Sequence, residues 1–263
     1  MKKILITGAN SYIGTSFEKY IKDNFSDQYQ VDTIDMIDGS WRKKSFVGYD
    51  VIFHVAGIAH QKETKENAHL YYEINRDLAF EVAKKAKEDG VKQFVFLSSM
   101  SVYGMDTGVI TKETKPNPKT NYGKSKLQAE EQIMDLRDNS FKVCILRPPM
   151  VYGEGCKGNY QAIIKIVKKY HVFPKVNNKR SVIHIDNLCL FVKDVIEEEF
   201  DGLLLPQNIK YANTTELAKQ IADSIGKKIY TSRFLGLVVV CLKPFSRTVK
   251  KAFGSLIYLQ GKF

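Results

Sequence analysis

Short apolar runs alternate with amphipathic stretches over the first half of the chain. Five runs have the length of buried parallel strands: residues 3–7, 30–35, 51–56, 94–97 and 142–146. Between them, apolar residues recur at helical spacing over residues 13–25, 74–86 and 122–136. Strands that alternate with helices predict an α/β fold built on a doubly wound parallel sheet.

The pattern becomes less regular after residue 150. This change predicts a smaller lobe that is appended to the sheet domain. We therefore expect one domain over residues 1–150 and a smaller one over residues 151–263, interleaved with the first. A chain of 263 residues is long enough to bury a core for this arrangement.

The segment TGANSYIG joins the first expected strand to the first expected helix. Gly8 permits a tight turn, and Gly14 lets the helix pack close to the strand. Ser11 stands where such loops carry a middle glycine, so less room is left for the backbone to approach a ligand. The helix N-terminus offers N–H groups to a pyrophosphate, although a turn without a ligand is the alternative. We predict a dinucleotide-binding loop that comprises Gly8, Asn10, Ser11, Tyr12, Ile13 and Gly14.

Asp35 falls at the end of the second expected strand, about 20 residues beyond this loop. A carboxylate at that place accepts hydrogen bonds from the adenosine ribose hydroxyls, which favours NAD as the cofactor. Asp32 and Asp38 compete for the same role. Arg42 and Lys43 follow and are suited to a 2′-phosphate, so NADP is the alternative.

Two further motifs contain hydroxyl groups and an amine that are candidates for acid–base catalysis. SSMSVYG follows the strand at residues 94–97 and contains Ser99, and TNYGKSK opens the helix at residue 122. Tyr122 and Lys126 are four residues apart, so their side chains share one face of a helix. An ammonium beside a phenol favours the phenolate, which makes the phenol a better acid–base catalyst near neutral pH. Taken singly, Ser99 fits a loop-capping serine, and the tyrosine–lysine pair fits a solvated helix turn.

The glycine loop, SSMSVYG and YGKSK, in this order, resemble the short-chain dehydrogenase/reductase superfamily. The resemblance covers almost the whole chain and is to the extended branch, the NAD-dependent epimerase/dehydratase family. It implies a Rossmann-type fold with a small C-terminal substrate-binding lobe. It also implies a catalytic triad in which Ser99 binds the reacting sugar oxygen and Tyr122 exchanges a proton with it. In this triad Lys126 holds the nicotinamide ribose.

Other segments resemble the same branch. DVIFHVAG implies that His54, Ala56 and Gly57 line the cofactor, although a buried histidine bonded to the backbone is the other interpretation of His54. Asn75 corresponds to a structural asparagine of the family, and an exposed helix residue is its alternative. LRPPMVYGEG implies that Pro149 borders the nicotinamide, unless the prolines only end the strand.

The substrate side of the resemblance lies in the second half. Met150 of LRPPMVYGEG would border the sugar, and KGNYQAI contributes Asn159 to the nucleotide-binding lobe. In NNKRSVIHIDNL the resemblance implies that Arg180 engages the diphosphate through a charge-assisted fork. A surface arginine is the alternative for Arg180.

The chain departs from the family between Asp35 and Asp50. Relatives insert a helix and a third strand there, whereas this chain has only MIDGSWRKKSFVGY, so we expect that strand to be missing or vestigial. Trp41 would then cover the adenine, or else serve as a packing tryptophan. The C-terminal segment KAFGSLIYLQGKF also reaches a point beyond which relatives continue, so we expect a shortened tail.

The motifs are most similar to a bacterial subgroup that acts on UDP-sugars in surface-polysaccharide synthesis. They imply redox chemistry at C4 of a UDP-hexose, by a UDP-glucose 4-epimerase or by a UDP-4-keto-6-deoxy-N-acetylhexosamine reductase. Both reactions use the same triad. Met100 and Ser101 offer no acid of the kind that a dehydratase would add. A non-catalytic dinucleotide-binding protein is a further alternative, but such relatives lose the tyrosine or lysine. The family analogy also implies a homodimer.

Composition and charge bear on whether the protein binds nucleic acid, a metal or a membrane. The net charge of +11 could attract nucleic acid, acidic lipid or a phosphorylated small molecule, but no nucleic-acid-binding signature accompanies it. The four cysteines show no metal-ligand spacing, so we expect no metal and reduced thiols in a cytoplasmic protein. The apolar run at residues 234–242 is too short to span a bilayer. With the basic residues up to 251 it would lie on an anionic surface or pack as a terminal helix.

Overall fold

The structure is a computed structural model that describes residues 1–59, 61, 63–156 and 158–260. The chain forms two compact units, and it passes between them several times. The first unit comprises Met1–Gly104, Pro116–Pro148 and Ile185–Pro206. The second comprises Met105–Lys115, Pro149–His184 and Gln207–Phe263. A single boundary near residue 150 therefore describes only one of these passages.

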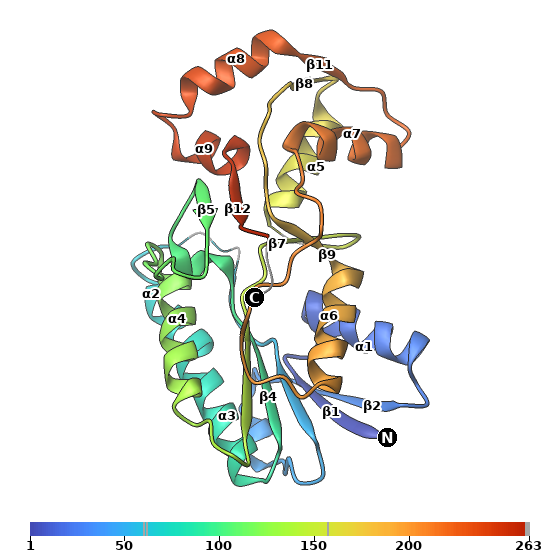
Figure 1. Cartoon of the computed structure of the whole chain (residues 1–263), viewed down its shortest axis with the longest axis vertical. Coiled ribbons are helices and arrows are strands. Elements are labelled where there is room, and N and C mark those ends of the chain that lie inside the picture. The colour runs from blue at the N-terminus through green and yellow to red at the C-terminus, as the bar shows by residue number, and fades with distance from the viewer. Residues whose placement is uncertain (60, 62, 157, 261–263) are drawn as a thin grey trace. The chain divides into compact units, whose positions relative to one another are not determined.

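A six-stranded parallel sheet forms the centre of the first unit (Figure 1). Its strand order is β10–β6–β4–β3–β1–β2, and every neighbouring pair is parallel. The inner strands β3 and β4 are buried at every position, because helices cover both faces. The predicted α/β fold is confirmed. The strands are β1 (Lys2–Thr7), β2 (Tyr29–Ile34), β3 (Val51–His54), β4 (Gln93–Leu97), β6 (Lys142–Leu146) and β10 (Gly202–Leu204).

The helices of the first unit lie in two layers. On one face, α1 (Tyr12–Asn24) packs against α6 (Ile185–Glu197). On the other, α2 (Ala68–Tyr72), the π-helical turn η2 (Glu73–Asp77) and α3 (Leu78–Glu88) pack against α4 (Asn121–Met134) (Figure 1). Phe17 and Ile21 of α1 are buried, as their spacing predicted, and Phe17 meets Phe53 edge to face.

The connection from β2 to β3 contains no strand. Residues 35–50 form only the short 3₁₀ helix η1 (Ser40–Lys43), so the expected loss of the third strand is confirmed. Trp41 is 1% exposed and packs among Ile34, Met36 and Phe46 in the core. It therefore has no surface to offer to an adenine, and the packing interpretation of Trp41 is correct. Since the family's helix is missing, an aromatic side chain fills the space beside the sheet.

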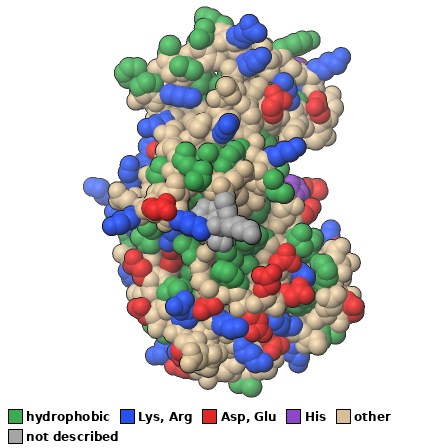
Figure 2. Space-filling model, in the orientation of Figure 1, with side chains coloured by type: hydrophobic (Ala, Val, Ile, Leu, Met, Phe, Trp, Pro, Cys, Tyr) green, Lys and Arg blue, Asp and Glu red, His purple; other side chains and the backbone are tan. Residues whose placement is uncertain are grey.

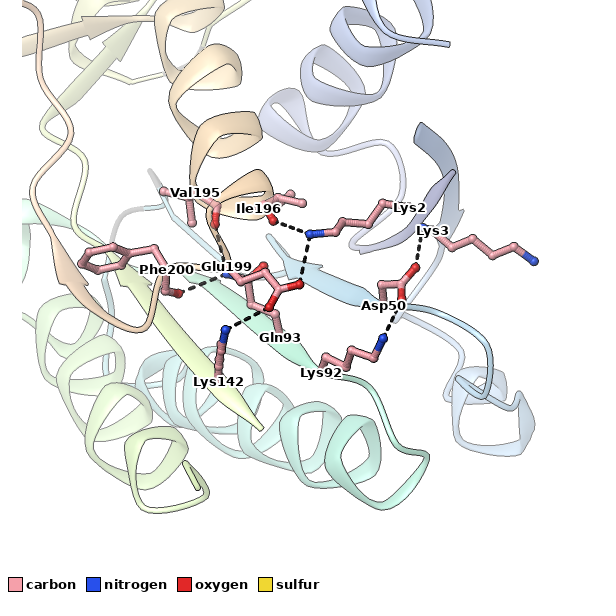
Figure 3. Close-up of polar contacts among 10 residues, drawn as sticks. All are labelled: Lys2, Lys3, Asp50, Lys92, Gln93, Lys142, Val195, Ile196, Glu199 and Phe200. Carbon is pink, nitrogen blue, oxygen red and sulfur yellow. Dashed lines mark hydrogen bonds and ion pairs between the residues drawn. The ribbon is translucent and has the colours of Figure 1, made fainter. Parts of the chain in front are cut away.

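Polar side chains fasten the amino-terminal edge of the sheet (Figure 3). The buried amide of Gln93 donates to the carbonyl oxygens of Val195 and Phe200, each at 3.1 Å. Glu199 accepts from Lys2 at 3.3 Å and from Lys142 at 2.9 Å. These contacts tie the end of α6 to three strands, at the edge opposite to the one where ligands bind in open α/β sheets.

The second unit contains three two-stranded parallel pairs and four helices among its described residues. Its core joins α5 and α7 through Val167, Phe173, Ala218, Ile221 and Ala222. The pairs are β5 (Gly108–Ile110) with β12 (Leu256–Tyr258), β7 (Met150–Tyr152) with β9 (Val182–His184), and β8 (Val172–Pro174) with β11 (Tyr230–Ser232). The helices are α5 (Asn159–Lys169), α7 (Thr214–Ser224), α8 (Arg233–Leu242) and α9 (Arg247–Phe253).

Candidate active site

The loop between β1 and α1 has the conformation that its glycines predict. Gly8 has φ +110°, and a Cβ there would lie 2.7 Å from the backbone nitrogen of Ala56. A Cβ on Gly14 would lie 2.6 Å from the hydroxyl of Ser11. That hydroxyl caps α1 by accepting from the N–H of Gly14 at 3.1 Å. Serine therefore replaces the middle glycine while it stabilises the helix whose N-terminus faces the loop.

The rest of the loop leaves backbone open at the helix N-terminus. Asn10 is exposed and has φ +64°, a conformation that asparagine tolerates better than most residues. Tyr12 and Ile13 form the first turn of α1 and are half-buried. A glycine turn that leads into a helix N-terminus is suited to a pyrophosphate.

Asp35 lies beside this loop. It directly follows Ile34, whose carbonyl oxygen accepts from the N–H of Gly8 at 3.0 Å. The Asp35 side chain is exposed, and Oδ1 accepts from the N–H of Ile37 at 2.9 Å. Arg42, the residue that would favour a 2′-phosphate, instead pairs with Glu81 at 2.6 Å.

His54 lies inside the fold. Its side chain is fully buried, and a 2.7 Å hydrogen bond joins Nδ1 to the hydroxyl of Thr7. The rings of Phe94 and Phe96 stack on it. Burial, with a smaller effect of the Lys126 charge, lowers the pKa of His54 to about 3. The expected contact of this side chain with a cofactor is therefore wrong. The buried interpretation is correct, although the partner is a threonine hydroxyl rather than the backbone.

The segment after β3 is held by Asn75, which lies in the π-helical turn η2. Asn75 is fully buried: Oδ1 accepts from the N–H of Ile58 at 2.8 Å, and Nδ2 donates to its carbonyl oxygen at 3.1 Å. A Cβ on Gly57 would lie 2.7 Å from Asn75 Oδ1 and 3.4 Å from Lys126 Nζ. Ala56 precedes it and is buried. The exposed interpretation of Asn75 is wrong, because this residue fixes the backbone of Gly57 beside Lys126.

The first turn of α4 rests on the turn after β4. Ser99 caps the 3₁₀ helix η3 (Met100–Tyr103) by accepting from the N–H of Ser101 at 3.1 Å. A Cβ on Gly123 would lie 2.7 Å from the carbonyl oxygen of Ser101. This close approach brings the first turn of α4, with Tyr122, to the turn that contains Ser99, and the Ser99 hydroxyl favours the charged form of the Tyr122 phenol. The capping interpretation of Ser99 is therefore correct for its backbone contact, and its hydroxyl also donates to the hydroxyl of Ser101 at 3.2 Å.

The pKa of Tyr122 is raised, mainly because of burial. The hydrogen bond from Ser99 lowers it in part, and Tyr71 raises it further. We had expected the Lys126 ammonium to lower the pKa of this phenol. The expectation is wrong for this structure. Desolvation of the phenolate raises the Tyr122 pKa more than any favourable interaction lowers it, and the interaction that lowers it comes from Ser99.

Lys126 is almost completely buried in α4. Its Nζ donates to the carbonyl oxygen of Leu97 at 2.9 Å and lies 4.6 Å from the ring centroid of Phe96. Burial lowers the pKa of Lys126 to about 8, and the negative charge of Glu130 acts in the opposite direction. The solvated-turn interpretation is therefore wrong for Lys126, which is a desolvated amine beneath the carboxyl edge of the sheet.

The expected substrate residues belong to the second unit. Pro149 is buried and precedes β7, in which Met150 is half-buried. Asn159 begins α5, and its side chain lies outside the described part of the structure. Arg180 is half-buried and donates through Nη1 to the carbonyl oxygens of Lys251 and Gly254, at 2.8 Å and 3.1 Å. It is therefore fixed to the end of α9 rather than free on the surface.

Comparison with known proteins decides the family. Residues 4–202 match the model of the NAD dependent epimerase/dehydratase family. The chain belongs to this family. The resemblance expected from the motifs is confirmed, and the protein is an enzyme of this NAD-dependent group.

Two relatives that match this chain are sugar 4-epimerases. UDP-glucose 4-epimerase of Vibrio cholerae is 29% identical over 276 residues, which cover 95% of this chain and 83% of the relative. N-acetyl-alpha-D-glucosaminyl-diphospho-ditrans,octacis-undecaprenol 4-epimerase of Escherichia coli O157:H7 is 25% identical and covers 86% of this chain and 73% of the relative.

Solved structures show the same fold. A dTDP-4-dehydrorhamnose reductase from Clostridium acetobutylicum superposes with a TM-score of 0.72 at 24% identity, covering 88% of this chain and 82% of the other. UDP-glucuronic acid 4-epimerase from Bacillus cereus, solved with NAD, gives a TM-score of 0.71 at 17% identity and covers 98% and 89%. The Rossmann-type architecture expected for an epimerase/dehydratase family member is thereby confirmed.

The sequence analysis missed a buried ion pair beneath this epimerase/dehydratase site. Arg147 and Glu130 meet through Nη2 and Oε2 at 2.5 Å and through Nε and Oε1 at 3.0 Å. Ser98 also donates to Glu130, and Arg147 donates to the hydroxyl of Tyr103 at 2.9 Å. A signal was present, because Glu130 falls four residues after Lys126 on the apolar side of α4.

Glu63 is the second residue that the sequence analysis missed. Its carboxylate accepts from the N–H groups of Asn121 and Tyr122, both at 3.2 Å, while Thr120 accepts from Gly123 at 3.1 Å. Together they cap the helix that carries Tyr122. No local pattern predicted this contact, since residue 63 and residue 121 are brought together only by the fold.

Proposed function

We propose that the protein catalyses NAD-dependent oxidoreduction at C4 of a UDP-hexose, as a UDP-glucose 4-epimerase does. The observation that carries this proposal is the placement of the three residues: the close approach of Gly123 to Ser101 sets the first turn of α4 against the turn that contains Ser99, and the desolvated amine of Lys126 lies one turn beyond Tyr122 on the same helix. A UDP-4-keto-6-deoxy-N-acetylhexosamine reductase is the alternative, since it would use the same three residues.

The first unit is suited to NAD. Gly8, Gly14 and Gly57 lie so close to neighbouring protein atoms that a Cβ would collide with them, as the tight turns of a dinucleotide-binding loop require. We assign the pyrophosphate to the turn from Gly8 to Gly14, comprising Asn10, Ser11, Tyr12 and Ile13, and the adenosine ribose to Asp35. The engagement of Arg42 with Glu81 supports NAD over NADP. When bound, the nicotinamide supplies the site with a reversible hydride acceptor.

Each member of the triad has one task. Ser99 donates a hydrogen bond to the oxygen on C4 and holds it beside the phenol of Tyr122. Because the pKa of Tyr122 is raised, the phenol is protonated at neutral pH and is set to donate a proton to a C4 keto oxygen. In the opposite direction the phenolate left by that donation accepts the proton of the C4 alcohol. Lys126 binds the ribose hydroxyls of the nicotinamide half. Ala56 and Gly57 line the cofactor beside its amine.

The second unit is assigned to the nucleotide sugar. In this proposal Met150 borders the sugar, Asn159 and Arg180 bind its diphosphate, and Pro149 borders the nicotinamide. The fork of Arg180 is already oriented by the carbonyl oxygens at the end of α9. The relatives from Vibrio cholerae and Escherichia coli are named for UDP-glucose and for a polyprenol-linked N-acetylglucosamine, which supports a diphospho-sugar. We further propose a cytoplasmic homodimer, which light scattering tests.

One assay separates the candidate reactions. The purified protein is incubated with UDP-glucose, UDP-N-acetylglucosamine and a UDP-4-keto-6-deoxy sugar, and both NAD(P)H absorbance and product stereochemistry are followed. Interconversion of C4 epimers without net NADH consumption identifies an epimerase, whereas stoichiometric NADH consumption identifies a reductase. NAD binding without turnover of any of the three substrates contradicts the proposal and indicates a non-catalytic binding protein.

The role of Tyr122 is tested with a matched pair of variants. Tyr122→Phe removes the proton donor, and we expect kcat to fall by about 10²–10⁴-fold with an unchanged thermal midpoint. Tyr20→Phe, a phenol on the outer part of α1, is the control and keeps full activity. If Tyr122→Phe retained activity, the phenol would not be the group that exchanges the proton.

A further inference from the structure

Helix α8 presents apolar side chains outward. Only Gly236 and Val239 of its ten residues are buried. Most of the exposed apolar residues recur every three or four positions and share one side of the helix, and Val240, at 56% exposed, widens that side. We call this row the α8 face; it consists of Phe234, Leu237, Val238, Cys241 and Leu242, followed by Phe245 in the next turn. Phe234, Leu237 and Phe245 are 72%, 65% and 88% exposed. A continuous exposed row of this kind marks an interaction surface.

The inner side of α8 is fixed, so the row cannot turn inward. The hydroxyl of Ser232 caps the helix by accepting from the N–H of Leu235 at 3.2 Å. The carbonyl oxygen of Ser232 accepts from the N–H of Lys175 at 2.9 Å. A Cβ on Gly236 would lie 2.2 Å from the carbonyl oxygen of Lys175, so only glycine allows the helix to lie this close to β8.

Positive charge surrounds the α8 face. Residues 224–263 contain no aspartate or glutamate, but they contain eight basic residues: Lys227, Lys228, Arg233, Lys243, Arg247, Lys250, Lys251 and Lys262. This segment thus contributes +8 of the net charge of +11. Among the basic residues that the structure describes, Arg247 pairs with Asp106 at 3.0 Å. Figure 2 shows apolar and basic side chains together over the region of α8.

We propose that the α8 face docks the protein onto the surface of an anionic phospholipid bilayer. The apolar row would enter the boundary between headgroups and acyl chains, while Lys243, Lys250 and Lys251 face the phosphates. A second copy of the chain is a poorer occupant, because it would bring like charges together. Within the described residues no helix is long and apolar enough to cross a membrane, so the attachment is to the surface. This inference does not depend on the proposed substrate.

Vesicle flotation tests the proposal. Wild-type protein is mixed, at about 0.15 M salt, with vesicles of phosphatidylcholine alone or of phosphatidylcholine with phosphatidylglycerol. We expect the bound fraction to be about tenfold higher with the anionic vesicles. The apolar variant Phe234→Ser/Leu237→Ser/Phe245→Ser and the charge variant Lys243→Gln/Lys250→Gln/Lys251→Gln should each reduce binding at least about fivefold.

The controls distinguish binding through the α8 face from nonspecific adsorption to the vesicles. Val47→Ser/Ile209→Ser removes two equally exposed apolar side chains elsewhere, and its binding should equal that of wild type. Circular dichroism and an unchanged thermal midpoint verify that each variant is folded. Absence of flotation with anionic vesicles, or undiminished flotation of the apolar variant, overturns the proposal. It is equally overturned if light scattering shows a wild-type dimer that the apolar variant dissociates, because a second copy then covers the face.

Discussion

At the scale of single residues, the buried His54 makes stability depend on pH. Its pKa is about 3 in the folded protein because of burial, and its ordinary value is 6.5. Below pH 6.5 the imidazole binds a proton in the unfolded chain but stays neutral in the folded protein. The free energy of unfolding therefore falls as the pH decreases from about 6.5 towards 3. We expect the loss from this residue to reach about 3 kcal/mol near pH 4.5.

The variant His54→Asn isolates this effect. Asparagine offers Thr7 a hydrogen-bonding partner but does not titrate, so its packing cost is the same at every pH. Urea unfolding of both proteins near neutral pH and near pH 4.5 gives the difference in free energy of unfolding. This difference should shrink on acidification, as the wild type loses its advantage. A difference that is constant with pH would mean that His54 is not desolvated.

The residue scale also separates what the sequence could predict from what it could not. The spacing of Tyr122 and Lys126 placed them on one helix face, and the position of Ser99 after a strand placed it at the carboxyl edge of the sheet. The direction of the Tyr122 pKa shift could not be predicted, since desolvation depends on neighbours such as Tyr71 that are distant in sequence. The burial of His54 was equally a property of the packed sheet.

At the scale of elements, the Glu130–Arg147 pair joins α4 to the end of β6. Both side chains are at most 8% exposed, so breaking the pair leaves a charge without its partner in a dry environment. Glu130→Gln should therefore lower the free energy of unfolding by about 3–5 kcal/mol. Calorimetry or urea unfolding measures this loss.

An exposed pair of similar geometry is the matched control. Arg42 and Glu81 approach to 2.6 Å, but their side chains are 55% and 49% exposed. Glu81→Gln should consequently cost no more than about 1 kcal/mol. The double variant Glu130→Gln/Arg147→Met should recover part of the loss, because no charge is left buried. Equal costs for Glu130→Gln and Glu81→Gln would show that burial does not set the strength of these pairs.

Most elements followed from the sequence because their apolar patterns are local. The missing third strand could be predicted from the shortness of the segment between Asp35 and Asp50. The place of Trp41 could not be predicted, because the same tryptophan fits an adenine or a core, and only the packing of the folded core decides between them. The Glu130–Arg147 pair escaped prediction for the same reason, as it depends on how α4 lies over β6.

At the scale of the whole molecule, the chain divides its motifs between two units. The first unit contains the glycine loop and the triad, and the second contains Met150, Asn159 and Arg180. The larger sheet domain was predictable, but the return of residues 185–206 to it was not. Those residues read as an ordinary helix and strand, and their pairing with β6 is a property of the folded sheet.

This division gives the last prediction, which concerns where each ligand acts. Saturation with NAD, at about 100 times its dissociation constant, should stabilise the protein by about 2.7 kcal/mol and slow amide hydrogen exchange in the segments of the first unit, above all residues 7–14 and 54–58. UDP should instead slow exchange in residues 149–184 and 207–260.

Arg180→Gln should abolish the protection by UDP and preserve the protection by NAD, because only the second unit has lost a diphosphate contact. Protection of the first unit alone by both ligands would contradict the assignment of the nucleotide sugar to the second unit, while a loss of both protections would show that Arg180 is needed for folding.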